Sequence, residues 1–172
     1  NNVFSNRLLF AEVGLLARNC VAEVYGEHYI ITAGDIVKHD GFKVTSIAND
    51  TVRKIIFDQI DPETYNTSFV TWNPFTQAVW FCFPSTGARF PNTALTYSTV
   101  TNVWGVRDLD EESPCVRYGF IDEPEFRAYD EQTETYDEAS QRYNQSLYSQ
   151  AIERCVQLDY ARTKMYAIDV GN

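Results

Sequence analysis

The sequence is poor in basic residues compared with acidic ones. Its 172 residues include 14 lysines and arginines against 24 aspartates and glutamates, which gives a formal net charge of −10. A protein that grips nucleic acid through its phosphates needs clustered lysine and arginine. This balance therefore argues against specific binding of DNA or RNA, while it allows passive contact in which charge repulsion keeps DNA from adhering.

The short motifs of common catalytic and cofactor sites are missing. There is no Gly-x-Ser-x-Gly elbow, no Gly-x-x-x-x-Gly-Lys loop and no Gly-x-Gly-x-x-Gly fingerprint. The only two histidines, His28 and His39, have no third ligand at a useful spacing, and we interpret them as ordinary strand residues. Asp122, Glu123 and Glu125 lack the spacing of a calcium loop. The sequence predicts no catalytic residue, no cofactor and no metal.

Cysteine pairs and long apolar runs are also missing. No Cys-x-x-Cys pair occurs, so a zinc site built from local spacing is not expected. An even count of cysteines permits two disulfides, but Cys82 lies between Phe81 and Phe83 and has the pattern of a small core residue. We expect reduced thiols and assembly in the cytoplasm. No apolar run approaches the roughly 20 residues that span a bilayer, so no membrane span is expected.

What the sequence does contain is two aromatic hairpins, at residues 69–83 and 94–107. Each has a β-branched and aromatic run, a polar turn and a second run that carries Val-Trp. Two such hairpins in succession suggest a repeated antiparallel unit like a propeller blade, and a single four-stranded meander is an equal alternative. Residues 20–45 predict another meander of four short strands, with Asp40-Gly41 as one of its turns.

The two hairpins can be aligned with each other. If Thr71 is laid on Thr96, then Trp72 falls on Tyr97, and one extra residue in the first turn brings the two Val-Trp pairs together. Residues that recur at equivalent hairpin positions indicate repeated core contacts, and buried aromatic rings contribute most to a core. The candidate core tryptophans are Trp72, Trp80 and Trp104.

A short amphipathic helix is predicted near residues 50–60. Apolar residues there recur at helical spacing, and Asn49 or Asp50 can cap its start. The pair Asp61-Pro62 ends it, because the residue before proline disfavours the helical region.

By composition, the chain divides into three parts. Residues 1–109 form the meander or propeller-like part, and residues 110–145 form an acidic loop or insertion. Residues 146–172 form a strand-containing tail of the same or the next domain, in which 150–159 and 164–170 are expected to pair. We expect a mainly β fold of antiparallel hairpins and meanders that is part of a β-propeller.

Acidic residues gather in one stretch. Residues 108–138 hold 12 of the 24 acidic side chains, with only two arginines among them. Paired carboxylates beside a tryptophan platform could serve glycoside hydrolysis, but acids this crowded are more typical of a solvated face. The acids that we expect to meet a partner or face a channel are Asp108, Asp110, Glu111 and Glu112.

At the hairpins the sequence resembles the tail nozzle protein of short-tailed bacteriophages, also called tail tubular protein B. The resemblance is carried by residues 73–85, which end in Val-Trp-Phe-Cys-Phe-Pro-Ser, and by residues 94–108. Residues 26–41 and the spaced set from Arg53 to Tyr65 add to it, so that it covers roughly residues 13–109. One departure is the alanine before the first Val-Trp pair, where many relatives would have glutamate.

This resemblance implies a structural, non-enzymatic protein of the virion tail. Such proteins form a ring of six subunits below the tail adaptor protein, with a propeller-containing body around a channel through which phage DNA passes without specific binding. A chain of 172 residues would be a fragment of such a subunit or a shorter relative. Two other functions stay open: a carbohydrate-binding or glycoside-hydrolysing β protein, and a cellular β-propeller interaction module.

Overall fold

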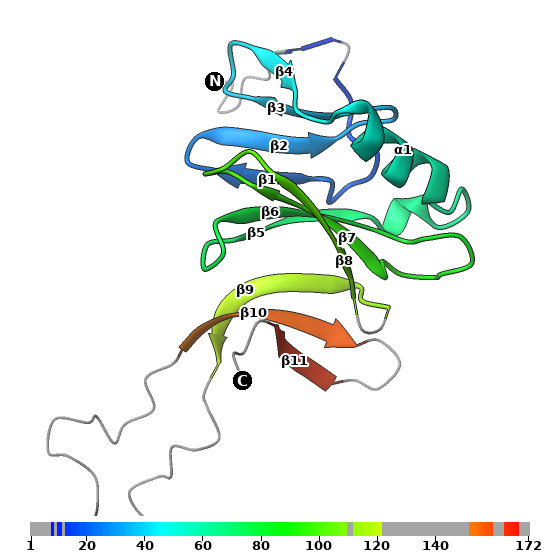
Figure 1. Cartoon of the computed structure of the whole chain (residues 1–172), viewed down its shortest axis with the longest axis vertical. Coiled ribbons are helices and arrows are strands. Elements are labelled where there is room, and N and C mark those ends of the chain that lie inside the picture. The colour runs from blue at the N-terminus through cyan, green and yellow to red at the C-terminus, as the bar shows by residue number, and fades with distance from the viewer. Residues whose placement is uncertain are drawn as a thin grey trace, which may run out of the picture.

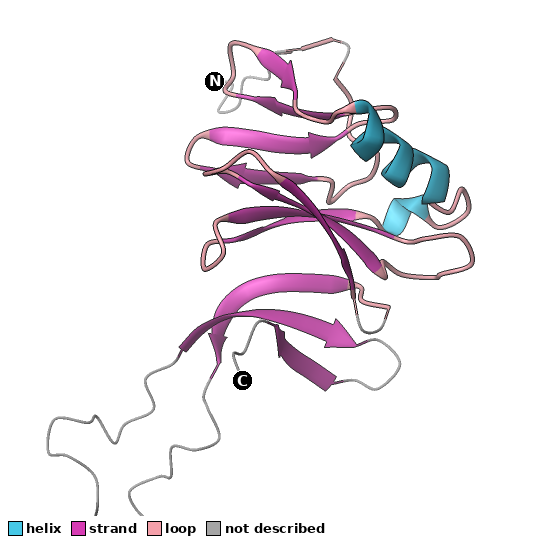
Figure 2. Cartoon of the chain, viewed as in Figure 1, coloured by secondary structure: helices cyan, strands magenta, loops and turns pink. Residues whose placement is uncertain are grey.

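The computed structural model describes residues 8, 10, 11, 13–109, 112–121, 152–159 and 164–168. This part of the chain forms eleven strands in three antiparallel sheets, one α-helix and one short 3-10 helix. Figure 1 shows the three sheets as successive layers, and Figure 2 shows that strands dominate. The mainly β class predicted from the sequence is confirmed, whereas most of the acidic stretch lies outside the described residues.

The first sheet is a meander in the order β1-β2-β3-β4. Its strands are β1 (Val21–Val24), β2 (Glu27–Ile31), β3 (Ile36–His39) and β4 (Val44–Ser46). The β1–β2 turn is Tyr25-Gly26, with φ of 52° and 84°, as a two-residue type I′ turn requires. At the β3–β4 turn His39 pairs with Val44, so the loop has four residues. Within it the Asp40 carboxylate accepts hydrogen bonds from the N–H groups of Phe42 and Lys43.

The second sheet is a meander in the order β5-β6-β7-β8 and contains both aromatic hairpins. Its strands are β5 (Phe69–Asn73), β6 (Ala78–Phe83), β7 (Thr93–Ser98) and β8 (Trp104–Asp108). Asn73 pairs with Ala78, and the N–H of Ser98 donates to the carbonyl of Val103. Both turns therefore have four residues, and the extra residue expected in the first turn is not there.

This register changes which residues of the hairpins correspond. Thr71 pairs with Trp80 in the first hairpin, and Thr96 pairs with Gly105 in the second. With Thr71 laid on Thr96, the structural counterpart of Trp80 is therefore Gly105 and not Trp104. A Cβ at Gly105 would come within 2.8 Å of the Thr96 hydroxyl oxygen. Because side chains alternate between the two faces of a strand, Trp80 and Trp104 lie on opposite faces of the sheet.

The third sheet has the order β11-β10-β9. Its strands are β9 (Cys115–Ile121), β10 (Ile152–Asp159) and β11 (Lys164–Ile168). The pairing expected between residues 150–159 and 164–170 is confirmed, because Cys155 to Asp159 of β10 pair with Lys164 to Ile168 of β11.

Helix α1 (Asp50–Gln59) joins the first two sheets and confirms the predicted helix. Its cap is Asn49, whose side-chain oxygen accepts a hydrogen bond of 2.9 Å from the N–H of Val52. Val52 and Ile56 are buried. The 3-10 helix η1 (Tyr65–Thr67) follows and leads into β5.

Two separate cores form on the two faces of the second sheet. One core lies between the first sheet, α1 and the second sheet, and includes Tyr29, Ile36, Ile56 and Phe81. The other core lies between the second and third sheets, and includes Trp80, Cys82, Ala94, Val116, Cys155 and Ile168. The second sheet is therefore buried on both sides, which explains why all six residues of β6 are buried.

The first strands of the three sheets lie beside one another. Asn19, just before β1, forms a parallel bridge with Phe69, and its carbonyl accepts a 2.8 Å hydrogen bond from the N–H of Val70. Strand β5 contacts β9 in turn. Each sheet has an open, linear strand order.

None of the four cysteines is in a disulfide, as expected from the sequence. Cys20, Cys82 and Cys155 are buried, and burial raises the pKa of the Cys20 thiol to about 11.

Within the described ranges, no helix has the length and apolar character needed to cross a bilayer.

The three candidate core tryptophans differ in burial, and we predict different costs of removing them. Trp80 is 2% exposed in the second core, whereas Trp72 is half-buried at the edge of the first core. Trp80→Ala should lower the free energy of unfolding by about 3–5 kcal/mol. Trp72→Ala should lower it by about 1–2 kcal/mol, because the side chain of Trp72 buries less apolar area than that of Trp80. Urea unfolding of both variants measures this difference, and equal losses would contradict the two placements.

Candidate interaction surface

The acidic residues singled out in the sequence are not all solvated. Asp108 ends β8 and is exposed, whereas Glu112 is half-buried. One carboxylate oxygen of Glu112 accepts hydrogen bonds of 3.1 Å from the N–H groups of both Arg89 and Phe90. Glu112 thereby holds the β6–β7 loop. Asp110 and Glu111 fall outside the residues that the structure describes.

The segment around Glu112 carries the chain from the second sheet to the third. The N–H of Leu109 donates to the carbonyl of Asn92 (2.8 Å), and the N–H of Ser113 donates to the carbonyl of Pro91 (2.7 Å). Leu109 is buried in the second core. These contacts with the β6–β7 loop fix the direction in which the chain enters β9.

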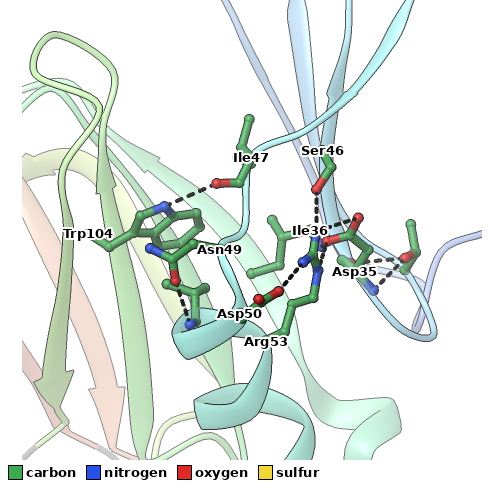
Figure 3. Close-up of polar contacts among 10 residues, drawn as sticks. Asp35, Ile36, Ser46, Ile47, Asn49, Asp50, Arg53 and Trp104 are labelled. Carbon is green, nitrogen blue, oxygen red and sulfur yellow. Dashed lines mark hydrogen bonds and ion pairs between the residues drawn. The ribbon is translucent and has the colours of Figure 1, made fainter.

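A polar joint fixes the first sheet and α1 to each other (Figure 3). Arg53 of α1 donates to the Asp35 carboxylate (2.9 Å), to the Asp50 carboxylate (3.0 Å) and to the hydroxyl of Ser46 (2.8 Å). Partial burial acts to raise the pKa of Asp35, but hydrogen bonds from Arg53, Ser46 and the N–H of Ile36 outweigh it and hold the pKa below its usual value.

Trp104 connects this joint to the second sheet. Its indole N–H donates to the carbonyl of Ile47, at 3.2 Å, in the segment between β4 and α1 (Figure 3). Its ring lies 4.9 Å from that of Tyr97 and 5.5 Å from that of Phe81. Trp104 is thus a half-buried packing residue that spans two sheets. Trp80 on the opposite face is covered by the Arg107 guanidinium, 5.0 Å from its ring centre.

The two histidines pair across β2 and β3. Their rings stack at 4.8 Å with an interplanar angle of 8°, and Phe10 lies 5.3 Å from the ring of His39. Burial and the neighbouring His28 lower the pKa of His39. Among the residues that the structure describes, no group of three or more histidine, cysteine or acidic side chains is placed to hold a metal ion.

Sequence reasoning missed an apolar surface formed by three turns. We call it the turn rim, and it consists of Tyr25, Trp72, Phe75, Val100 and Val103. The β1–β2, β5–β6 and β7–β8 turns that carry it project on the left in Figure 1. Exposed fractions are 82% for Tyr25, 66% for Phe75, 64% for Val100 and 61% for Val103. Large apolar residues inside otherwise polar turn sequences were the available signal.

Direct contacts hold the three turns together. The rings of Tyr25 and Trp72 meet edge to face at 5.9 Å and 77°, which joins the β1–β2 turn to β5. The carbonyl of Gln77 accepts hydrogen bonds of 3.1 Å from both the N–H and the hydroxyl of Thr99, which joins the β5–β6 turn to the β7–β8 turn. The turn rim is therefore one surface and not three unrelated tips.

Comparison with known proteins yields no assignment: no family model matches the sequence, and no curated protein matches it.

The two described acids should respond differently to truncation. Glu112→Ala removes the acceptor of two backbone N–H groups and should lower the free energy of unfolding by about 1–3 kcal/mol. Asp108→Ala removes an exposed carboxylate and should change it by less than about 0.5 kcal/mol. Urea unfolding of both variants tests this, and equal values would mean that Glu112 does not hold the β6–β7 loop.

Proposed function

We propose that this chain is a non-enzymatic structural part of a bacteriophage tail, from the nozzle that surrounds the DNA channel. The residues that resemble nozzle proteins lie together in the fold. Residues 73–85 include β6, and residues 94–108 include β8 and most of β7, so both fall within the second sheet. The resemblance therefore concerns the element around which both cores are built.

The arrangement of the sheets supports this proposal most strongly. Two consecutive four-stranded meanders pack face to face, and a third sheet packs on the second. Their first strands β1, β5 and β9 lie beside one another. Neighbouring blades of a β-propeller have this arrangement. We infer that the three sheets are successive blades of a larger propeller.

The net charge of the chain supports a place in the wall of the DNA channel. A net charge of −10 disfavours adhesion of DNA, and a channel wall needs DNA to move past it without sticking. We propose that copies of the chain stand in a ring of six around that channel, attached to the tail adaptor protein. The virion tail is then its location, after assembly in the host cytoplasm.

The placement of the tryptophans makes the carbohydrate alternative less attractive. A sugar platform needs an accessible aromatic face, but Trp80 is buried and covered by Arg107. The indole N–H of Trp104 is used by the carbonyl of Ile47. Trp72 and Trp104 are both half-buried, but of the three tryptophans only Trp72 lies beside an exposed aromatic neighbour, Tyr25.

Quantitative mass spectrometry of purified virions tests the proposal. Tryptic peptide 90–107 contains β7 and most of β8, and is a suitable reporter. Virions purified from infected cultures that encode the chain should contain this peptide in a constant ratio to peptides of the adaptor protein from one preparation to the next. The host membrane fraction serves as a control for contamination. Absence of peptide 90–107 from the particles, while infected cells contain it, would refute a role in the tail.

A further inference from the structure

His28 and His39 form a polar pair on the outer face of the first sheet. They are direct partners in the β2–β3 ladder, and their half-buried rings stack at 4.8 Å. Tyr29, Ile31 and Ile36 belong to the first core, so alternation along the strands places both histidines on the face turned away from that core. A change in the charge of the pair can therefore act without opening either core.

The Nδ1 atom of His39 is an acceptor for the β3–β4 loop. The N–H of Gly41 donates to it at 3.2 Å. An imidazole nitrogen accepts a hydrogen bond only when it carries no proton, so this bond requires the neutral ring with its proton on Nε2. An imidazolium has protons on both nitrogens and cannot accept. Protonation of His39 therefore removes the bond to Gly41.

The neighbouring His28 makes a charge on this pair costly. Its Nδ1 atom is buried and, within the described part of the chain, has no hydrogen-bond partner. A proton on that atom would be a buried donor without an acceptor. Two charged rings stacked at 4.8 Å would also repel each other. Burial and the neighbouring His28 accordingly lower the pKa of His39.

Charged side chains on the strands beside the pair are engaged elsewhere. Glu23 lies opposite His28 on β1, but its carboxylate accepts a hydrogen bond of 2.7 Å from the N–H of Gly26. Glu27 and Lys38 form an ion pair with each other at 2.8 Å. Neighbouring residues of a strand point to opposite faces, so this ion pair lies on the other face of the sheet from the two histidines.

The segments that touch His39 bring one opposite charge. Asp40 favours the protonated ring, but less strongly than burial and His28 oppose it, and its carboxylate already accepts from two N–H groups of the loop. Lys43 is exposed in the same loop and has the sign of an imidazolium. Val44, the partner of His39 on β4, and Phe10, whose ring lies 5.3 Å from that of His39, are uncharged.

We propose that His28 and His39 form a pH-sensitive switch, which holds the β3–β4 loop in its present conformation while His39 is neutral and lets the loop rearrange when His39 takes up a proton. The bond that changes is the one from the N–H of Gly41 to Nδ1 of His39. The same loop carries Phe42, whose side chain is 94% exposed, so the switch moves a large apolar group at the surface. The inference goes beyond the role in the tail and does not depend on it.

The direction of the pH dependence follows from the lowered pKa of His39. Because the fold lowers this pKa below its usual value of about 6.5, the folded chain binds the proton less readily than the unfolded chain does. The stability that the neutral ring contributes is therefore fully present above about pH 6.5. It is lost as the pH falls from there through the pKa of the folded state, so the loop rearranges in acid.

An NMR titration of the chain from about pH 7.5 to about pH 4.5 tests the proposal. The Gly41 amide resonance should move with the same midpoint as the imidazole resonances of His39. Its protection against hydrogen exchange, relative to the unstructured rate at each pH, should fall by about tenfold because one hydrogen bond is lost. The N–H of Gly26 is bonded to a carboxylate, so it serves as the internal control and should not follow the His39 midpoint.

Two variants separate the roles of the two rings. His39→Asn cannot titrate but keeps an oxygen that can accept from the N–H two residues on, so the Gly41 amide should stay protected down to about pH 4.5. His28→Gln removes the neighbouring charge and should raise the midpoint of His39 toward about 6.5. Thermal midpoints at about pH 7.5, where histidines are neutral, check that both variants are folded.

Three results would overturn the proposal. The first is a Gly41 amide that stays unchanged while His39 titrates, because its bond would then not depend on the proton. The second is the same pH response of Gly41 in the His39→Asn variant, which would assign the response to a carboxylate. The third is a His39 midpoint that His28→Gln leaves unchanged, because the two rings would then titrate independently.

Discussion

The structure depends on the burial of both faces of the second sheet. Alternation along β6 sends Val79, Phe81 and Phe83 into one core, and Trp80 and Cys82 into the other. A strand buried on both faces must be apolar throughout, and Ala78–Phe83 has that composition. Neither neighbouring sheet could bury its inner face without this one, so both cores depend on a correctly registered β5–β8 meander.

The connections between the sheets are polar at the edges and apolar within. Arg53 ties α1 to the first sheet, and the indole of Trp104 ties the segment between β4 and α1 to the second sheet. Glu112 ties the crossover into β9 to the β6–β7 loop. The partly exposed ion pairs of Arg53 contribute little stability by themselves. Their role is to set the direction of the chain between layers, while buried apolar area supplies most of the free energy.

Much of the local structure could be predicted from the sequence, whereas contacts between distant segments could not. Helix α1 and the paired β10 and β11 follow from spacing and caps within a few residues. The match of Trp80 with Trp104 was wrong because one residue of register moves a side chain to the other face, and Trp80 corresponds to Gly105. The use of Glu112 by the N–H groups of Arg89 and Phe90 joins positions over 20 residues apart, and no local pattern records it.

Hydrogen–deuterium exchange at individual backbone amides tests the central claim most directly. If the second sheet is the shared wall of both cores, amides of β6 and β7 should exchange slowest and only through global unfolding. Amides of β4 and β11, at the outer edges of the first and third sheets, should exchange faster through local opening. Exchange in β6 as fast as in β4 would contradict a structure built around a doubly buried sheet.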